Sequence, residues 1–213
     1  MVKNTPYKVI SYLTYPALWA TVGTAIIAGS EGQLPWAPVV ILSLLCHSLL
    51  PLIFVALMVK YKKFESIEIP NLQHRRQTAV AAMASAILFS ALIYITDESS
   101  NYHLWNQLIL LSLWLQWLFN KWNFKISIHV LSFSAFALFL DIHKENGSNG
   151  ISFREVFPSL PEHFFLYLFI VGAALIGFAR HKLKAHSLAE TLIAALMGAS
   201  LAAVNESLWS LAQ

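Results

Sequence analysis

Long apolar runs, separated by short polar stretches, dominate the chain. A helix that crosses a bilayer needs about 20 mostly apolar residues. Lipid offers no hydrogen-bond partner to unpaired backbone groups, so runs of this kind form α-helices. We therefore expect an all-α, polytopic membrane bundle of about seven (six to seven) transmembrane helices. The apolar segments cover residues 9–28, 38–59, 78–96, 104–119, 126–141, 162–179 and 187–204.

Turn-forming and charged residues mark the boundaries between these segments. The stretches EGQLP, DESSN and DIHKENGSNGISFREVFPSLP are of this kind. The segment at 104–119 either crosses the membrane or lies partly along its surface, because it contains several tryptophans and tryptophan prefers the membrane interface. The chain shows no internal repeat, so we expect a single domain over residues 1–213.

The first apolar segment has two interpretations. A basic leader followed by an apolar stretch is also typical of a cleaved signal peptide. The stretch from about Val9 to Ala28 is long enough to cross a membrane. Its length favours a retained first helix.

Composition supports a membrane protein and excludes several kinds of site. Of the 213 residues 57% are hydrophobic and only 12% are charged, which is unusual for a soluble domain. The single Cys46 excludes an intramolecular disulfide and a zinc site built on several cysteines. The net charge of +3 gives no support to nucleic-acid binding. His47, next to Cys46 within an apolar segment, is expected to pack or to form an interhelical hydrogen bond rather than to hold haem or a metal.

Basic residues are concentrated on one side of the predicted bundle. One crossing per segment places residues 60–77, 120–125 and 180–186 on the same side as the N-terminus. Of the 14 Lys and Arg residues, only Lys144 and Arg154 fall on the other side. Basic loops stay in the cytoplasm, so this bias indicates a cytoplasmic location for the basic face.

A cluster of titratable residues lies between the last two apolar segments, in the run ARHKLKAHSLAE. Such residues at the mouths of membrane helices are costly and indicate function. If a helix begins near His186, Glu190 lies one turn later and can orient the imidazole, which makes its free nitrogen nucleophilic. An uncapped helix start would add amides and a positive dipole end for an anion. The alternative is an ion pair at a helix end beside lipid headgroups.

The same side carries residues suited to phosphate. Arg180, Arg75, Arg76 and Lys125 can hold an anion, arginine with its planar fork especially. His129 opens another apolar segment and can protonate a leaving group there. The set fits phosphoryl transfer. Arg180 as a positive-inside anchor, His129 as an interfacial residue, and a structural role for Arg75 or Arg76 are the alternatives.

Three separated blocks resemble the membrane-embedded type 2 phosphatidic acid phosphatases, a family that shares its site design with vanadium haloperoxidases. The family's third block reads S-R, five residues, H, three residues, D. Its second reads P-S-G-H, and its first reads K, six residues, R-P. The stretches ARHKLKAHSLAE, ISIH and IEIPNLQHRRQTAV are similar to these in turn.

This resemblance implies a function and a role for each residue. His186 would form a phosphohistidine that Glu190 orients, and His129 would protonate the departing alcohol and then activate water. Arg75, Ser127 and Arg180 would bind the phosphate of a lipid phosphate substrate within the surrounding membrane lipids. No metal and no cofactor are implied. The compact form is similar to a bacterial branch of the family, which implies the bacterial inner membrane.

The chain departs from the family pattern at several positions. Glu68 and Thr78 replace a lysine and a proline of the first block, and Lys125 is a candidate substitute for that lysine. Ile128 replaces a glycine of the second block, and Ala179 replaces a serine of the third. Glutamate for aspartate at position 190 changes reach more than chemistry.

These departures leave a second function open, a weakened or inactive protein that binds lipid phosphates. A small transporter is a third possibility, but the chain lacks paired Gly/Pro-broken helices in matching halves. The sequence leaves the oligomeric state open.

Overall fold

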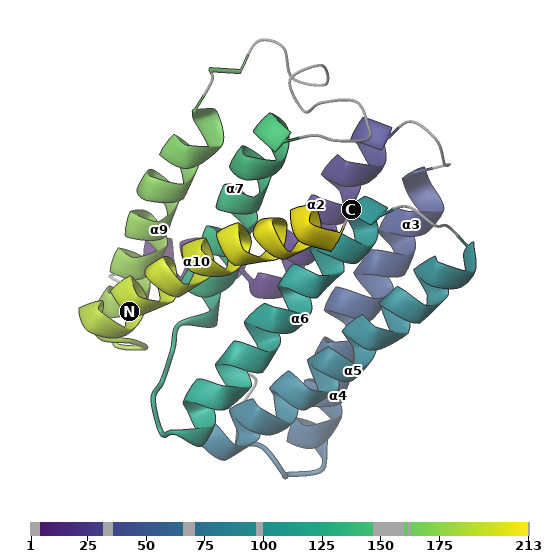
Figure 1. Cartoon of the computed structure of the whole chain (residues 1–213). Coiled ribbons are helices and arrows are strands. Elements are labelled where there is room, and N and C mark those ends of the chain that lie inside the picture. Colours follow the sequence, from purple (N-terminus) through teal and green to yellow (C-terminus); the bar gives the residue numbers. More distant parts are fainter. Residues whose placement is uncertain are drawn as a thin grey trace.

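The structure, a computed structural model, describes residues 5–31, 36–65, 71–96, 100–146, 160–161 and 163–212. These residues form an all-helical bundle (Figure 1). Its helices are α1 Thr5–Leu13, α2 Pro16–Glu31, α3 Trp36–Ser43, η1 Leu44–Leu49, α4 Leu50–Lys60, α5 Leu72–Thr96, α6 Ser100–Lys121, α7 Ile128–Asn146, α9 Phe164–Lys182 and α10 Leu188–Ala212.

Fewer helices than expected are long and apolar enough to cross a membrane. Within the described ranges there are 4 candidate spans, Ala37–Lys60, Leu72–Ile95, Phe164–Lys182 and Leu188–Leu208, and up to 5 if α1 and α2 together form one bent span. The expected six to seven spans are not supported. The apolar part of α7, Ile128–Ile142, is too short. In α6, polar residues such as Asn106 and Gln107 interrupt the apolar sequence.

The segment expected as one helix at 9–28 is broken. Helix α1 ends at Leu13, and α2 begins at Pro16 after a bend of 45°. Proline has no N–H to donate and its fixed φ suits the first turn of a helix, so Pro16 starts a new helix instead of continuing α1. The break brings Ser11 and Tyr15 to the end of the bundle where the candidate site lies.

The segment at 38–59 is one span with a widened turn. The π-helix η1 lies between α3 and α4, and the Leu50 amide donates to the Leu45 carbonyl, five residues back. Pro51 follows directly and cannot donate to the carbonyl of His47. The missing donor accounts for a local π turn at this place.

His47 lies in that π turn and joins several helices. Its Nε2 is 2.9 Å from Asn106 Oδ1 on α6, and its Nδ1 is 2.9 Å from Ser43 Oγ. Ser43 Oγ in turn lies 2.9 Å from Thr24 Oγ1 on α2. The expected interhelical hydrogen bond of His47 is confirmed.

The outer surface of the bundle carries large apolar side chains, and its interior contains some polar ones. Ile95, Leu192 and Ile87 are 78%, 61% and 58% exposed, a surface suited to lipid. Trp105, by contrast, is 3% exposed and its Nε1 donates to the Ala20 carbonyl. Trp105, one of the tryptophans of the segment at 104–119, therefore belongs to the core and not to the membrane interface.

Helix α7 is the centre of the core and α10 packs directly against it (Figure 1). Along α7, Leu131, Ala137, Phe139 and Leu140 are all 0% exposed. Gly198 of α10 faces the Leu131 carbonyl so closely that a Cβ there would collide with it. This contact sets how closely α10 approaches α7, and candidate site residues lie at or just before the starts of these two helices.

Candidate functional site

The predicted site residues come from the ends of several helices. Arg75 lies in the first turn of α5, Lys125 in the link between α6 and α7, His129 at the start of α7, Arg180 near the end of α9, and His186 in the link to α10. The charges of Arg75 and Arg180 act on each other and on those of His129, His186 and Lys125, and the charge of Glu190 acts on Arg75 and Lys125. The structure thus brings three distant stretches of the chain together at one end of the bundle.

His186 is buried and has a defined tautomer. It is 5% exposed, and its Nδ1 lies 3.0 Å from the carbonyl oxygen of Lys125. A carbonyl oxygen only accepts, so Nδ1 carries the proton. The lone pair of the neutral ring is then on Nε2, the atom that a nucleophilic role requires.

Burial and positive charge keep this ring neutral. Burial is the largest cause that lowers the pKa of His186 from 6.5 to about 3, followed by the positive charges of Arg75, Arg180 and Lys125. The hydrogen bond to Lys125 acts the other way. The imidazole is therefore uncharged at neutral pH.

Lys125 belongs to the same positive environment. Burial is the first cause that lowers the pKa of its ammonium group, and Arg75 and Arg180 add to this effect, whereas Glu190 opposes it. Three cations held this close repel one another, so the arrangement favours a bound anion of high charge.

His129 occupies the first turn of α7 beside Ser127. Its ring lies edge-on to Tyr15, with 6.2 Å between the ring centroids. Among the residues that the structure describes, neither the buried Nδ1 of His129 nor the Oγ of Ser127, a residue 0% exposed, has a hydrogen-bond partner. Buried polar atoms are usually paired, so both atoms are available to a ligand.

Arg180 is held by a residue that the sequence analysis did not identify. Its Nη1 donates to Ser11 Oγ of α1 at 2.6 Å, across 169 residues of sequence. A lone serine in an amphipathic first helix gives no signal of this contact. Helix α1 therefore helps to build the site.

Glu190 lies beside His186 as expected, and it also caps the start of a helix. Helix α10 begins at Leu188, with Ser187 before it. The Ser187 amide donates to Glu190 Oε2 at 2.8 Å, and the Glu190 amide donates to Ser187 Oγ at 3.2 Å. This is a capping box, and the expected uncapped helix start is wrong because two of its amides are occupied. Glu190 Oε2 also lies 3.4 Å from His186 Nδ1. The Lys125 carbonyl oxygen, at 3.0 Å, is the closer partner of this nitrogen.

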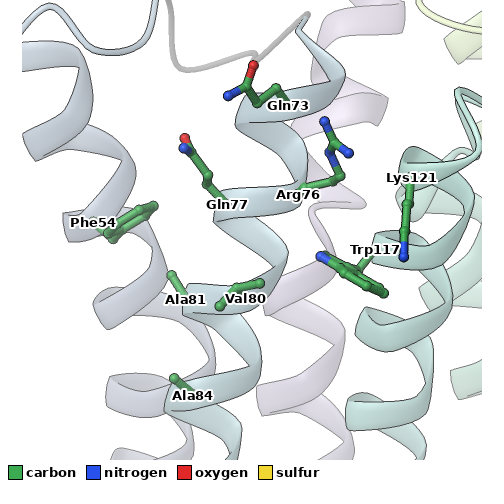
Figure 2. A pocket seen from close by; sticks show the side chains of 9 residues that line it. All are labelled: Phe54, Gln73, Arg76, Gln77, Val80, Ala81, Ala84, Trp117 and Lys121. Atoms are coloured by element: carbon green, nitrogen blue, oxygen red, sulfur yellow. The ribbon is translucent and has the colours of Figure 1, made fainter.

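Arg76 lies apart from this cluster. It lines a groove between α4, α5 and α6, together with Gln77 and Lys121 (Figure 2). Adjacent helix residues point about 100° apart, so Arg75 and Arg76 face different sides of α5. The cluster contains the first of the two arginines, and the groove contains the second.

Among the described residues no three His, Cys, Asp or Glu side chains form a group that could hold a metal ion. No family model, curated protein or solved structure matches this chain. The site consists of two imidazoles, both with a pKa lowered by burial and by nearby positive charge, among three cations and one carboxylate. Such a set can bind a phosphate dianion and transfer its phosphoryl group.

Proposed function

We propose that the protein is a membrane phosphatase that hydrolyses a phosphomonoester or pyrophosphate of a lipid through a phosphohistidine. The observation that carries the proposal is His186, a neutral imidazole with its proton on Nδ1, next to Arg75, Arg180 and Lys125. A lipid substrate suits this position because its headgroup reaches the basic end of the bundle while its chains remain among the apolar outer side chains. The resemblance to type 2 phosphatidic acid phosphatases supports the same reaction.

The reaction has two steps. Nε2 of His186 forms a bond to phosphorus as the bond to the lipid oxygen breaks. His129 gives its proton to that oxygen. Burial and the neighbouring cations lower the pKa of His129, and the negative charge of the bound phosphate opposes them and keeps the ring protonated for this step. Neutral His129 then takes a proton from water, whose oxygen bonds to phosphorus as the bond to Nε2 breaks. Free phosphate leaves, His186 is neutral again, and His129 is protonated. Arg75, Arg180 and Ser127 stabilise the charge on the phosphoryl oxygens.

Phosphate release from lipid phosphates by the purified protein, in the presence of a chelator, tests the proposal. We expect His186→Ala and His129→Ala to lower the rate by at least about 100-fold, the usual contribution of a positioned acid or base. His181→Ala is the matched control, because His181 is exposed and one residue from Arg180. Full activity of His186→Ala would exclude the phosphohistidine route.

A second candidate, a lipid-phosphate binding protein without turnover, is favoured by the capping box. In that arrangement Glu190 stabilises the start of α10 and the Lys125 carbonyl, not a carboxylate, is the nearer partner of His186. Ile128 and Ala179 also differ from the family pattern. Binding of a lipid phosphate that Arg75→Gln abolishes, without phosphate release by the wild type, would favour this candidate.

We place the protein in the bacterial inner membrane with the site on the cytoplasmic side. The support for this location is the segregation of the basic residues and the compact form of the resembled motifs.

A further inference from the structure

The groove between α4, α5 and α6 has a polar end and an apolar floor. On α5, Gln73, Arg76 and Gln77 form one end of a helical stripe, and Val80, Ala81 and Ala84 continue it. The spacing of these positions, by three or four residues, keeps them on one face of the helix. Figure 2 shows both halves of the stripe along α5.

The walls of the groove that α4 and α6 form are also polar at one end and apolar along the rest. Lys121, the last residue of α6, lies on the wall across from Arg76, with its side chain directed along α6 toward Trp117, and Phe54 of α4 borders the apolar part (Figure 2). Lys121 Nζ lies 5.4 Å from the centroid of the Trp117 ring, and tryptophan is typical of the level of lipid headgroups. In the described part of the chain, no carboxylate forms an ion pair with Arg76 or Lys121.

The dimensions suit an amphipathic ligand. From Arg76 to Ala84 the helix rises about 12 Å, at 1.5 Å per residue. Helix α5 is a candidate membrane span from Leu72, so Arg76 lies near its end and Ala84 deeper. A phosphate at the polar end would have an acyl chain beside the small alanines.

We propose that this groove binds an anionic phospholipid, with its phosphate between Arg76 and Lys121 and an acyl chain over Ala81 and Ala84. The assignment follows from charge complementarity at one end and small apolar side chains along the rest. Arginine binds two phosphate oxygens at once, and the glutamine amides can donate to the others. The groove lies on a different face of α5 from Arg75, so this lipid is separate from any substrate at His186.

Native mass spectrometry of the purified protein tests the proposal, with phosphatidylglycerol and phosphatidylcholine of identical acyl chains. We expect the wild type to retain phosphatidylglycerol preferentially. In Arg76→Gln/Lys121→Gln this preference should fall about tenfold, because each basic residue near an anionic headgroup strengthens binding severalfold. Ala84→Trp fills the apolar part and should lower retention without any change in charge.

Matched controls separate the groove from the rest of the surface. Arg75→Gln alters the neighbouring arginine that faces the candidate site, and Lys182→Gln alters a lysine that also lies over an aromatic ring, 5.2 Å from Phe178, outside the groove. Ala174→Trp adds the same bulk on the exposed side of α9. Lys182→Gln and Ala174→Trp should retain phosphatidylglycerol as the wild type does, and Arg75→Gln shows whether any of the lipid is bound at the candidate site instead.

Three results would overturn the proposal. One is equal retention of the two lipids by the wild type, and another is unchanged retention in Arg76→Gln/Lys121→Gln. A loss in Arg75→Gln without a loss in the groove variants would assign the lipid to the candidate site. Unchanged retention in Ala84→Trp would leave an anion site without an acyl chain and would also contradict the assignment.

Discussion

The protonation state and the position of single side chains in the candidate site depend on groups that are far away in sequence. At position 186, burial and the positive charges of Arg75, Arg180 and Lys125 all lower the pKa of the imidazole, and the hydrogen bond to the Lys125 carbonyl only partly opposes them. The ring therefore resists protonation in the folded protein. This resistance has a measurable consequence for stability.

The pKa of His186 predicts how the free energy of unfolding changes with pH. Between pH 6.5 and about 3 the unfolded chain binds a proton at this residue and the folded chain does not. The contribution of this residue to the free energy of unfolding is fully present above pH 6.5 and decreases as the pH falls toward 3. From pH 7 to pH 5 the loss should be about 2 kcal/mol.

Denaturation in detergent at both pH values measures this effect. In His186→Gln the loss between pH 7 and pH 5 should be smaller than in the wild type. His181→Gln, at an exposed position, should keep the wild-type pH dependence. The same pH dependence in all three proteins would show that His186 is accessible to protons in the folded state.

Ser11 predicts a role of α1 in substrate binding. If Arg180 binds phosphate, Ser11→Ala removes the hydroxyl that holds its Nη1 at 2.6 Å. We expect KM for a lipid phosphate to rise about fivefold, near 1 kcal/mol for a lost hydrogen bond, with a smaller change in kcat. Ser11→Thr keeps a hydroxyl and should restore most of the affinity.

The control for Ser11→Ala is Ser200→Ala, because Ser200 is exposed and bonds only within its own helix, to the Leu196 carbonyl. Its KM should equal that of the wild type. A fall in kcat with unchanged KM in Ser11→Ala would contradict a positioning role for Ser11 in binding.

At the scale of helices, the contact between α7 and α10 positions the two imidazoles. Small residues allow membrane helices to approach closely, and Gly198 has this role against the backbone of α7 at Leu131. The obstacle to a larger residue is backbone, which cannot move aside as a flexible side chain can. The distance between the two helices depends on this approach.

Gly198→Ala should therefore destabilise the protein by about 1–3 kcal/mol, the usual cost of overpacking. Thermal unfolding in detergent would detect the change. Gly29→Ala is the matched control, because a Cβ there meets nothing within 4 Å. Alanine is also the better helix former, so Gly29→Ala should be neutral or slightly stabilising. Equal effects of the two substitutions would mean that α7 and α10 are farther apart than described.

For the whole molecule, the distribution of basic residues predicts the orientation in the membrane. Lys62→Cys in a Cys46→Ala background places one exposed thiol in the link between α4 and α5. A membrane-impermeant maleimide should label it only after the cells are opened, because basic loops remain in the cytoplasm. Ile95→Cys, 78% exposed near the other end of α5, should react in intact cells. The reverse pattern would place the candidate site outside.

Much of the architecture follows from local properties of the chain. The length and polarity of the apolar runs predicted helices and most of their positions, because each depends on neighbouring residues. The count of spans was too high, since Pro16 breaks the first segment and the apolar part of α7 is short. For the site, alternation of segments predicted that residues 75, 129 and 186 would lie at the same end of the bundle.

The sequence by itself determined an all-helical membrane protein and the types of residue at one of its ends. The apolar runs and the charge bias can be recognised along the chain without knowing how the helices pack. Only the tertiary structure decided which arginine joins the histidines, because the rotation of α5 places Arg75 at the cluster and Arg76 in the groove. It also decided that Ser11 holds Arg180 and that the Lys125 carbonyl orients His186. Those contacts join residues from different helices, so they depend on how the helices pack and on no local pattern.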